Sequence, residues 1–346
     1  MPSKTNPLAI ILGVLALLLL VGLFADGRGF LATLAKGIAL GSVYALIALG
    51  FVLIFKATRT INFAQGALAV CGALFVSFLA VDDNIPFTTL QNPIVHIPGP
   101  DWLRWILCVV VALMFAALLG LIIERTTIRP MIGKPLFSVA VITLGLEIAL
   151  RVFALDSSKL GGFRSLAIPW GSDSFEVGGV RMNWSYLAAF LVASAAFVAV
   201  FFFYRSRMGV AMRAVSYDQE AAMAQGINVG RVFAIAWAAG AVLAALGGIF
   251  ATQPPLSQTG AVGQETVFVA FRALPAVILG GLDSVQGALL GGLTIGLAEI
   301  LAGQYLSGQT DTLGAGYPVI IPYVVMVIGL LVKPYGMFGT PEVRRV

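Results

Sequence analysis

Long apolar runs separated by short polar breaks make up most of the chain. A transmembrane helix needs about 20 consecutive apolar residues, and about ten runs approach that length. The expected spans are 7–25, Leu31–Phe55, a run that ends near Val81, Trp102–Ile123, Leu136–Leu155, Tyr186–Tyr204, Val232–Phe250, two runs within 267–303, and Tyr317–Val332. The pattern predicts an all-α integral membrane protein in which residues 1–346 form a single transmembrane domain.

The basic residues set the expected orientation of these spans. When the spans alternate across the membrane, Lys4, the loops 124–134 and 205–231, and the pair Arg344–Arg345 all fall on one side. Short loops rich in Lys and Arg stay in the cytoplasm. We therefore expect both termini inside.

Composition agrees with a membrane protein and excludes several other classes. The chain is 59% hydrophobic and 11% charged, whereas soluble domains carry about 25% charged residues. The net charge of +5 does not indicate a nucleic-acid partner, because the basic residues stand at the ends of apolar runs. With one histidine, His96, and two cysteines inside apolar runs, we expect no metal site, no cofactor and no catalytic residues. A phosphate-binding GxxxxGK[ST] motif is also missing from the sequence, so any ATPase must be a separate chain.

The segment 205–231 is the longest polar interruption in the second half of the chain. Four arginines accompany two acids, Asp218 and Glu220. A short helix is expected over Ser216–Gln225, with Ser216 as its cap and Gln219 completing a capping box. Three alanines favour the helix, namely Ala221, Ala222 and Ala224, and Gly226 is expected to end it.

Two interpretations of this helix remain open. It is either an ordinary cytoplasmic loop with the usual positive bias, or a docking helix whose alanine face fits a groove on a soluble partner.

Charged residues within spans are costly, so each needs a partner or a wet cavity. Glu147 and Arg151 are four residues apart, which favours a local ion pair, although Glu147 is also a candidate for the translocation path. Lys36, Arg272 and Glu299 are expected near the outer ends of their spans, where long side chains reach water.

Two polar breaks are further candidates for the path. Asn62 and Gln65 occupy the first, and Asp283, Ser284 and Gln286 occupy the second. Irregular backbone at membrane depth is tolerated only where it is buried in protein or lines a cavity. The alternative is that both breaks are cytoplasmic turns. The runs that flank the second break form either two thin spans or discontinuous helices that meet inside the membrane.

The sequence resembles the H-type permease subunits of ABC importers for branched-chain amino acids. The matching stretches are GIALGSVYALIALGFVLIF, INFAQGAL, IERTTIRP, SRMGVAMRAVSYDQEAAMAQGINVGRV, AVILGGLDSVQGALLGGLTIGLAE and VKPYGMFGTPEVRRV. Their order and spacing fit from about Leu31 onward. Gln65 stands where the family typically has histidine, so any role of that histidine is lost here.

The resemblance implies an ABC importer permease fold with some broken or short helices. It also implies a second permease subunit, which is an M-type homologue or a second copy. The resemblance further implies two cytoplasmic ATPases, an extracytoplasmic binding protein and a location in the bacterial inner membrane. Residues 216–226 would be the coupling helix.

The substrate remains open between branched-chain amino acids and the urea, short amides or aromatic acids that similar importers carry. We expect a path with few fixed charges, suited to a small apolar or zwitterionic solute. An ion-coupled secondary transporter and a membrane enzyme are the competing classes, and the first would need an intramembrane acid such as Glu147.

Overall fold

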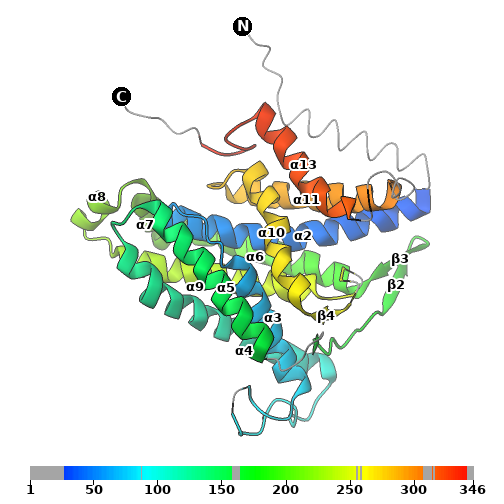
Figure 1. Cartoon of the computed structure of the whole chain (residues 1–346). Helices are drawn as coiled ribbons and strands as arrows, with labels where there is room; N and C mark the ends of the chain where they lie inside the picture. The colour runs from blue at the N-terminus through cyan, green and yellow to red at the C-terminus, as the bar shows by residue number, and fades with distance from the viewer. Residues whose placement is uncertain are drawn as a thin grey trace.

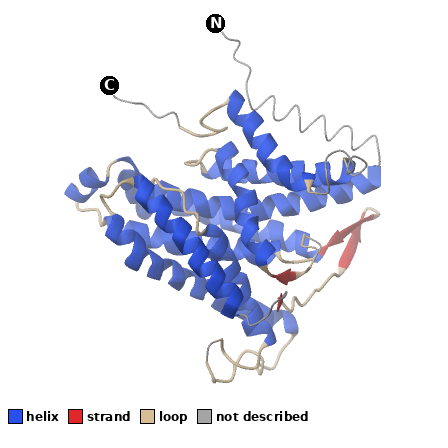
Figure 2. Cartoon of the chain, viewed as in Figure 1, coloured by secondary structure: helices blue, strands red, loops and turns tan. Residues whose placement is uncertain are grey.

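The computed structural model describes residues 27–86, 88–157, 164–254, 256–257, 259–306, 314 and 316–340. The expected first span at 7–25 and the basic residues Lys4, Arg344 and Arg345 lie outside these ranges. Figure 2 shows that helices dominate the part of the chain that is described.

The helices follow the expected spans closely. They are α2 (Gly27–Thr58), α3 (Gln65–Val81), α4 (Asp101–Ile123), the π-helical turn η1 (Glu124–Ile128), the 3₁₀ turn η2 (Arg129–Met131), α5 (Leu136–Ser157), α6 (Trp184–Arg205), α7 (Arg207–Tyr217), α8 (Gln219–Ala224), α9 (Val229–Ala251), α10 (Gln264–Gly280), α11 (Val285–Tyr305) and α13 (Tyr317–Val332). Within the described ranges, six helices are long and apolar enough to cross a membrane, and α3 and α13 are shorter apolar helices.

Polar residues start several of these helices. The side chains of Asn183, Asn228 and Ser284 accept backbone hydrogen bonds at the first turns of α6, α9 and α11 respectively. Such caps satisfy N–H groups that have no partner within the helix.

Helix α2 lies at the centre of the molecule, surrounded by α6, α9, α10 and α11 (Figure 1). Its middle is buried on every side, including Val43, Leu46 and Leu49. A helix that is apolar all round belongs in the interior of a bundle.

Small residues allow α11 to pack closely along α2. A Cβ on Gly41 would lie 2.8 Å from Leu293 Cα, and one on Gly292 would lie 2.6 Å from Ala45 Cα. A Cβ on Gly37 would lie 2.8 Å from Leu297 Cδ2. The Gly37, Gly41 and Ala45 pattern therefore forms the close-packing face that four-residue spacing of small residues predicts.

The outer helices present apolar side chains away from the core. Examples are Met114 on α4, Phe137 on α5, Phe202 on α6 and Leu331 on α13, all more than 60% exposed. A surface of this kind suits lipid tails, which are as apolar as these side chains.

The segment 267–303 forms a helical hairpin. Helices α10 and α11 pack side by side, and Gly280 and Gly287 come into backbone contact beside the turn. The chain beyond α13 covers the same turn, since the N–H groups of Met337 and Phe338 bond to the carbonyls of Leu279 and Gly280. The Gly280–Ser284 break is thus a covered turn between two helices.

Two short strand pairs depart from the all-α expectation. Strand β1 (Arg164–Ser165) pairs with β4 (Ala261–Val262), and β2 (Ser174–Val177) pairs with β3 (Val180–Asn183), both antiparallel. Gly178 and Gly179 join β2 to β3 with φ of 60° and 80°, as a two-residue hairpin with the right twist requires.

Candidate functional site

The polar segment 205–231 forms two helices, α7 and α8, that project at one end of the molecule (Figure 1). The side chain of Ser206 caps α7, and Asp218 caps α8 by accepting a 2.9 Å bond from the N–H of Ala221. The prediction that Ser216 caps the docking helix is therefore wrong, because Ser216 lies in the last turn of α7. Asp218 takes the capping position because its extended backbone interrupts the helix there.

Gly226 ends α8 as the sequence predicts. Its φ is +81°, and its N–H bonds to Met223 O while the N–H of Ile227 bonds to Ala222 O. These paired bonds make the Schellman motif, in which glycine adopts the left-handed conformation without a side-chain penalty.

The orientation of α8 changes which residues can meet a partner. Ala222 is only 4% exposed and belongs to the hydrophobic core of this chain. The prediction that Ala222 faces a groove on another protein is therefore wrong. Glu220, Ala221 and Ala224 face outward.

Two larger apolar residues beside these alanines were not singled out from the sequence. Tyr217 is 83% exposed and Met223 is 48% exposed. Their positions close to the alanines were visible in the sequence. Those positions indicate an exposed surface only when the buried side of α8 is known.

Basic side chains fasten this segment to the end of α2. Arg59 donates from Nε to the carbonyl of Ser216 at 2.9 Å. Arg213 donates to the carbonyl of Tyr204 at 2.7 Å, and Lys56 lies over the Tyr204 ring at 4.8 Å from its centroid. A displacement of α7 would therefore act on the central helix as well as on α6.

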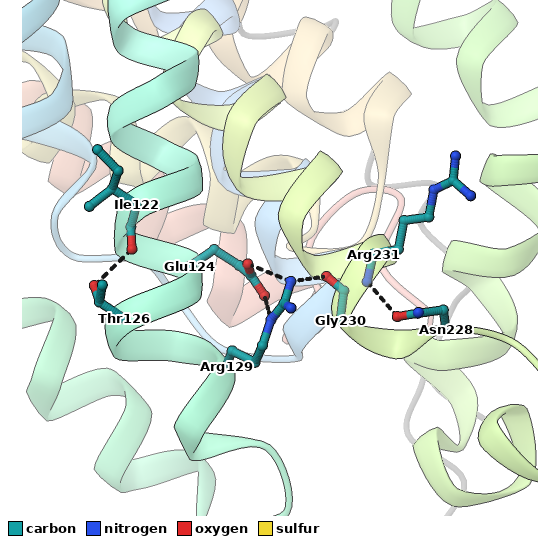
Figure 3. Close-up of polar contacts among 7 residues, drawn as sticks. All are labelled: Ile122, Glu124, Thr126, Arg129, Asn228, Gly230 and Arg231. Atoms are coloured by element: carbon teal, nitrogen blue, oxygen red, sulfur yellow. Dashed lines mark hydrogen bonds and ion pairs between the residues drawn. The ribbon is translucent and has the colours of Figure 1, made fainter.

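The loop after α4 is tied to the start of α9 (Figure 3). Arg129 donates to both carboxylate oxygens of Glu124, at 2.9 and 3.0 Å, and to the carbonyl of Gly230 at 3.1 Å. Glu124 is 1% exposed. Because Gly230 is in the first turn of α9, the pair joins the two loops on this end of the molecule.

The first polar break is closed by its own amides. Asn62 donates from Nδ2 to Gln65 Oε1 at 2.9 Å, and Gln65 donates from Nε2 to the carbonyl of Gly240 at 3.2 Å. Asn62 also accepts the N–H of Ala64 at 3.0 Å. Both amides are buried. Their hydrogen bonds connect the break after α2 with the start of α3 and with α9.

The other predicted path residues lie apart from these amides. Glu147 accepts a 2.9 Å bond from Arg151, which confirms the local ion pair. Asp283 bonds to Thr340, Ser284 caps α11 and Gln286 is exposed. The predicted path residues thus occupy three separate places in the fold.

A cavity of about 540 Å³ lies at the opposite end from α8, between α2, α10, α11 and α13. Its wall includes three polar residues from three different helices, namely Tyr44, Arg272 and Glu299. Tyr44 donates from its hydroxyl to Glu299 Oε2 at 2.6 Å, and Arg272 Nη1 lies 4.0 Å from Glu299 Oε1.

This cavity corrects one expectation. Glu299 is 7% exposed and bonded within the bundle, so the prediction that it reaches outward to water at the end of its span is wrong. The cavity wall carries four charged residues, and the expected path with few fixed charges stays a prediction. The sequence does show an acid and an arginine within Gly- and Ala-rich runs. It does not show how deep in the bundle the two side chains lie, because that depends on where each helix begins.

The described arrangement suits transport. Charged groups within membrane helices mark substrate or ion pathways, and the structure provides such groups beside a cavity at one end and the two short helices α7 and α8 at the other.

Comparison with known proteins identifies the family. A family model described as branched-chain amino acid transport system / permease component matches residues 33–332. The high-affinity branched-chain amino acid transport system permease protein LivH of Escherichia coli (strain K12) is 32% identical over 327 residues, which cover 92% of this chain and 98% of that protein. Its counterpart BraD of Pseudomonas aeruginosa is 28% identical over 334 residues, with the same coverage.

A solved structure, PsaBC from Streptococcus pneumoniae in complex with Fab, covers 92% of this chain and 97% of its own at 15% identity. Its TM-score of 0.47 is too low to support an argument about detail. With its apolar helical bundle, this chain is a multi-pass protein of the bacterial cytoplasmic membrane. It is a transport subunit of an ABC importer and not an enzyme. The family match and the sequence relatives show that it belongs to the permease components of branched-chain amino acid transport systems.

Proposed function

We propose that the chain forms the translocation path for branched-chain or other small amino acids, which an extracytoplasmic binding protein delivers. The family and the names of relatives that match 92% of the chain support this substrate class. Urea, short amides and aromatic acids are the alternative cargoes for the same machinery. An ion-coupled secondary transporter is the alternative mechanism, and it would need a titrating intramembrane acid.

The assembled importer would contain a second permease subunit, either a homologue or a second copy, and two cytoplasmic ATPases. The segment 205–231 would couple ATP hydrolysis to transport through α8. The observation that carries this assignment is the two-sided character of α8, which buries Ala222 in its own chain and exposes Met223 and Ala224, beside the exposed Tyr217 at the end of α7. A short helix of this kind can seat in a groove of a partner while it moves the helices behind it.

We further propose ten spans with both termini in the cytoplasm. The α8 end of the molecule carries many basic residues, among them Lys56, Arg59, Arg129, Lys134 and Arg207, and such residues favour the cytoplasmic side. A cysteine at Ser172 should then react with an impermeant maleimide from outside, and one at Tyr217 should not. The reverse labelling pattern would overturn the orientation.

Uptake by the reconstituted importer tests the function. Proteoliposomes that hold both permeases and both ATPases should accumulate labelled leucine only when ATP and the binding protein are supplied. Leucine uptake driven by an ion gradient without ATP would instead indicate a secondary transporter. Uptake of urea or benzoate in place of leucine, with their own binding proteins, would indicate the alternative cargoes.

A further inference from the structure

We propose that the cavity between α2, α10 and α11 binds the charged end of the transported amino acid, with Arg272 facing its carboxylate and Glu299 facing its ammonium. This inference rests on the proposed function and adds to it a binding site in the permease itself. It makes the permease a second point of selection, after the binding protein.

The depth of the three polar residues is the first observation. Tyr44 lies 14 residues before the end of α2 at Thr58, which is about 21 Å at 1.5 Å per residue. Arg272 lies eight residues from either end of α10, and Glu299 lies six residues before the end of α11. A charged group within a membrane helix costs up to about 2.5–3.5 kcal/mol on insertion scales and therefore indicates a functional site.

The incomplete pairing of Arg272 is the second observation. Its Nη1 lies 4.0 Å from Glu299, which is beyond hydrogen-bond distance, and its Nε is buried with no hydrogen-bond partner among the described residues. The neighbouring Tyr323 hydroxyl donates to the carbonyl of Phe271 instead. Arginine offers five N–H donors in a planar fork that matches a carboxylate. The Arg272 side chain lines the cavity and is 31% exposed, so its terminal N–H groups, rather than the buried Nε, are the donors that a ligand can reach.

The charge balance of the cavity indicates the class of ligand. Lys36 and Arg272 contribute two positive charges, and Glu265 and Glu299 contribute two negative charges. A zwitterion can pair with one charge of each sign. A carboxylate anion would leave Glu299 without a counter-charge, and urea or an amide carries no charge to satisfy either group.

The rest of the cavity suits an aliphatic side chain. Leu40, Val269 and Ile300 belong to its wall beside the polar residues. Its volume of about 540 Å³ falls within the range of small-molecule sites, roughly 300–1,000 Å³. The cavity therefore combines a charged, balanced region with apolar surface, as a neutral branched amino acid requires.

A protection assay on the permease tests this inference without the binding protein. Thr259 is exposed and lines the cavity, so a Thr259→Cys variant lacking Cys71 and Cys108 carries one reporter thiol in this chain, whose labelling is read on the separated permease. The purified permease–ATPase complex is treated with a maleimide in the presence of leucine, 4-methylpentanoate or 3-methylbutylamine. The two analogues retain the branched chain but lack the ammonium or the carboxylate, respectively.

Leucine should slow the labelling of the reporter, and neither analogue should do so at the same concentration. Arg272→Gln and Glu299→Gln should each raise the leucine concentration for half-protection about tenfold or more. Glu299→Gln keeps an oxygen that can accept the Tyr44 hydrogen bond. A loss of protection in this variant is therefore due to the missing negative charge. Glu176→Gln and Arg181→Gln are the matched controls, because this cross-strand pair is exposed on the β2–β3 hairpin, and they should protect like the unsubstituted reporter.

The outcomes separate this inference from the proposed function. Equal protection by leucine and both analogues would overturn the inference, since apolar contact alone would explain it. Absence of protection in a complex that imports leucine with ATP and binding protein would also overturn it and leave the proposed function standing. A complex that imports no leucine under those conditions would reject the proposed function first.

Discussion

Tyr44 and Glu299 are 255 positions apart in the sequence and share a 2.6 Å hydrogen bond that ties α2 to α11. The bond lies in the middle of the bundle, a few residues from the glycines that let the same two helices touch. Close helix packing and a polar site are thus adjacent, so a ligand that alters the Glu299 carboxylate would act directly on the packing of α2.

Replacing Tyr44 with phenylalanine should destabilise the permease. The change leaves one oxygen of a buried carboxylate without its donor, at a cost of about 1–3 kcal/mol. Thermal unfolding in detergent should show a lower midpoint than for Tyr217→Phe, whose ring is 83% exposed. Equal midpoints for the two variants would mean that the Tyr44 bond contributes nothing to stability.

Glu124→Gln should weaken the junction between the loop after α4 and the start of α9. Glu124 is 1% exposed and accepts both hydrogen bonds from Arg129. Hydrogen bonds to charged groups contribute about 1.5–3 kcal/mol, and the partly exposed Arg129 places the expected loss toward the lower part of that range.

The comparison for Glu124→Gln is Asp101→Asn, which removes an exposed pair with Arg104. Surface pairs contribute about 0–1 kcal/mol, so this variant should unfold near the wild-type denaturant concentration. Chemical unfolding followed by tryptophan fluorescence would rank the two. A larger effect at Asp101 than at Glu124 would contradict the assigned role of the Arg129 contacts.

Local patterns in the sequence predicted several features correctly. The four-residue spacing of Gly37, Gly41 and Ala45 is typical of a close-packing face, which in the structure meets α11, and the glycine at 226 identified the end of α8. The four-residue spacing of Glu147 and Arg151 identified their ion pair. Each of these depends on neighbours within one or two helical turns, which a single sequence displays directly.

Other features depend on contacts that the sequence does not display. Ser216 and Asp218 are both good capping residues, and the choice between them follows from where α7 ends on the body of the protein. The burial of Ala222 depends on the rotation of α8 about its axis. The bond between Tyr44 and Glu299 required the pairing of two helices from opposite ends of the chain.

Gly226→Ala should destabilise the end of α8 without creating a steric clash. A Cβ at this position would meet nothing within 4 Å, so the cost comes from the left-handed backbone at φ +81° and is about 1–2 kcal/mol. Hydrogen exchange at the amides of Gly226 and Ile227, which close the Schellman motif, should become faster.

The control for Gly226→Ala is Gly145→Ala in α5. A Cβ there also meets nothing within 4 Å, and no left-handed φ is required. Alanine is the better helix former by about 1 kcal/mol, so this variant should be as stable as the wild type or more stable. Loss of stability at Gly145 equal to that at Gly226 would show that backbone conformation is not the cause.

Arginine substitutions on the two sides of α8 should have opposite consequences. Ala224 is exposed, so Ala224→Arg should leave the permease folded and reduce the ATPase retained on the purified complex. Ala222 is 4% exposed in the core of this chain, so Ala222→Arg should lower the yield and thermal stability of the permease itself. Overpacking alone costs about 1–3 kcal/mol, and a buried unpaired charge adds to it.

Both variants should reduce substrate-stimulated ATP hydrolysis, so that measurement cannot separate them alone. The separating measurements are the unfolding temperature of the isolated permease and the ATPase that co-purifies with it. Gln286→Arg is the matched control, because this exposed residue beside the α10–α11 turn gains the same charge outside α8. It should retain both stability and ATPase. If Ala224→Arg also retains the ATPase at the wild-type level, α8 is not the coupling element, and the loop that Glu124 and Arg129 brace becomes the next candidate, because it is the other basic loop joined to α9 at the same end of the molecule.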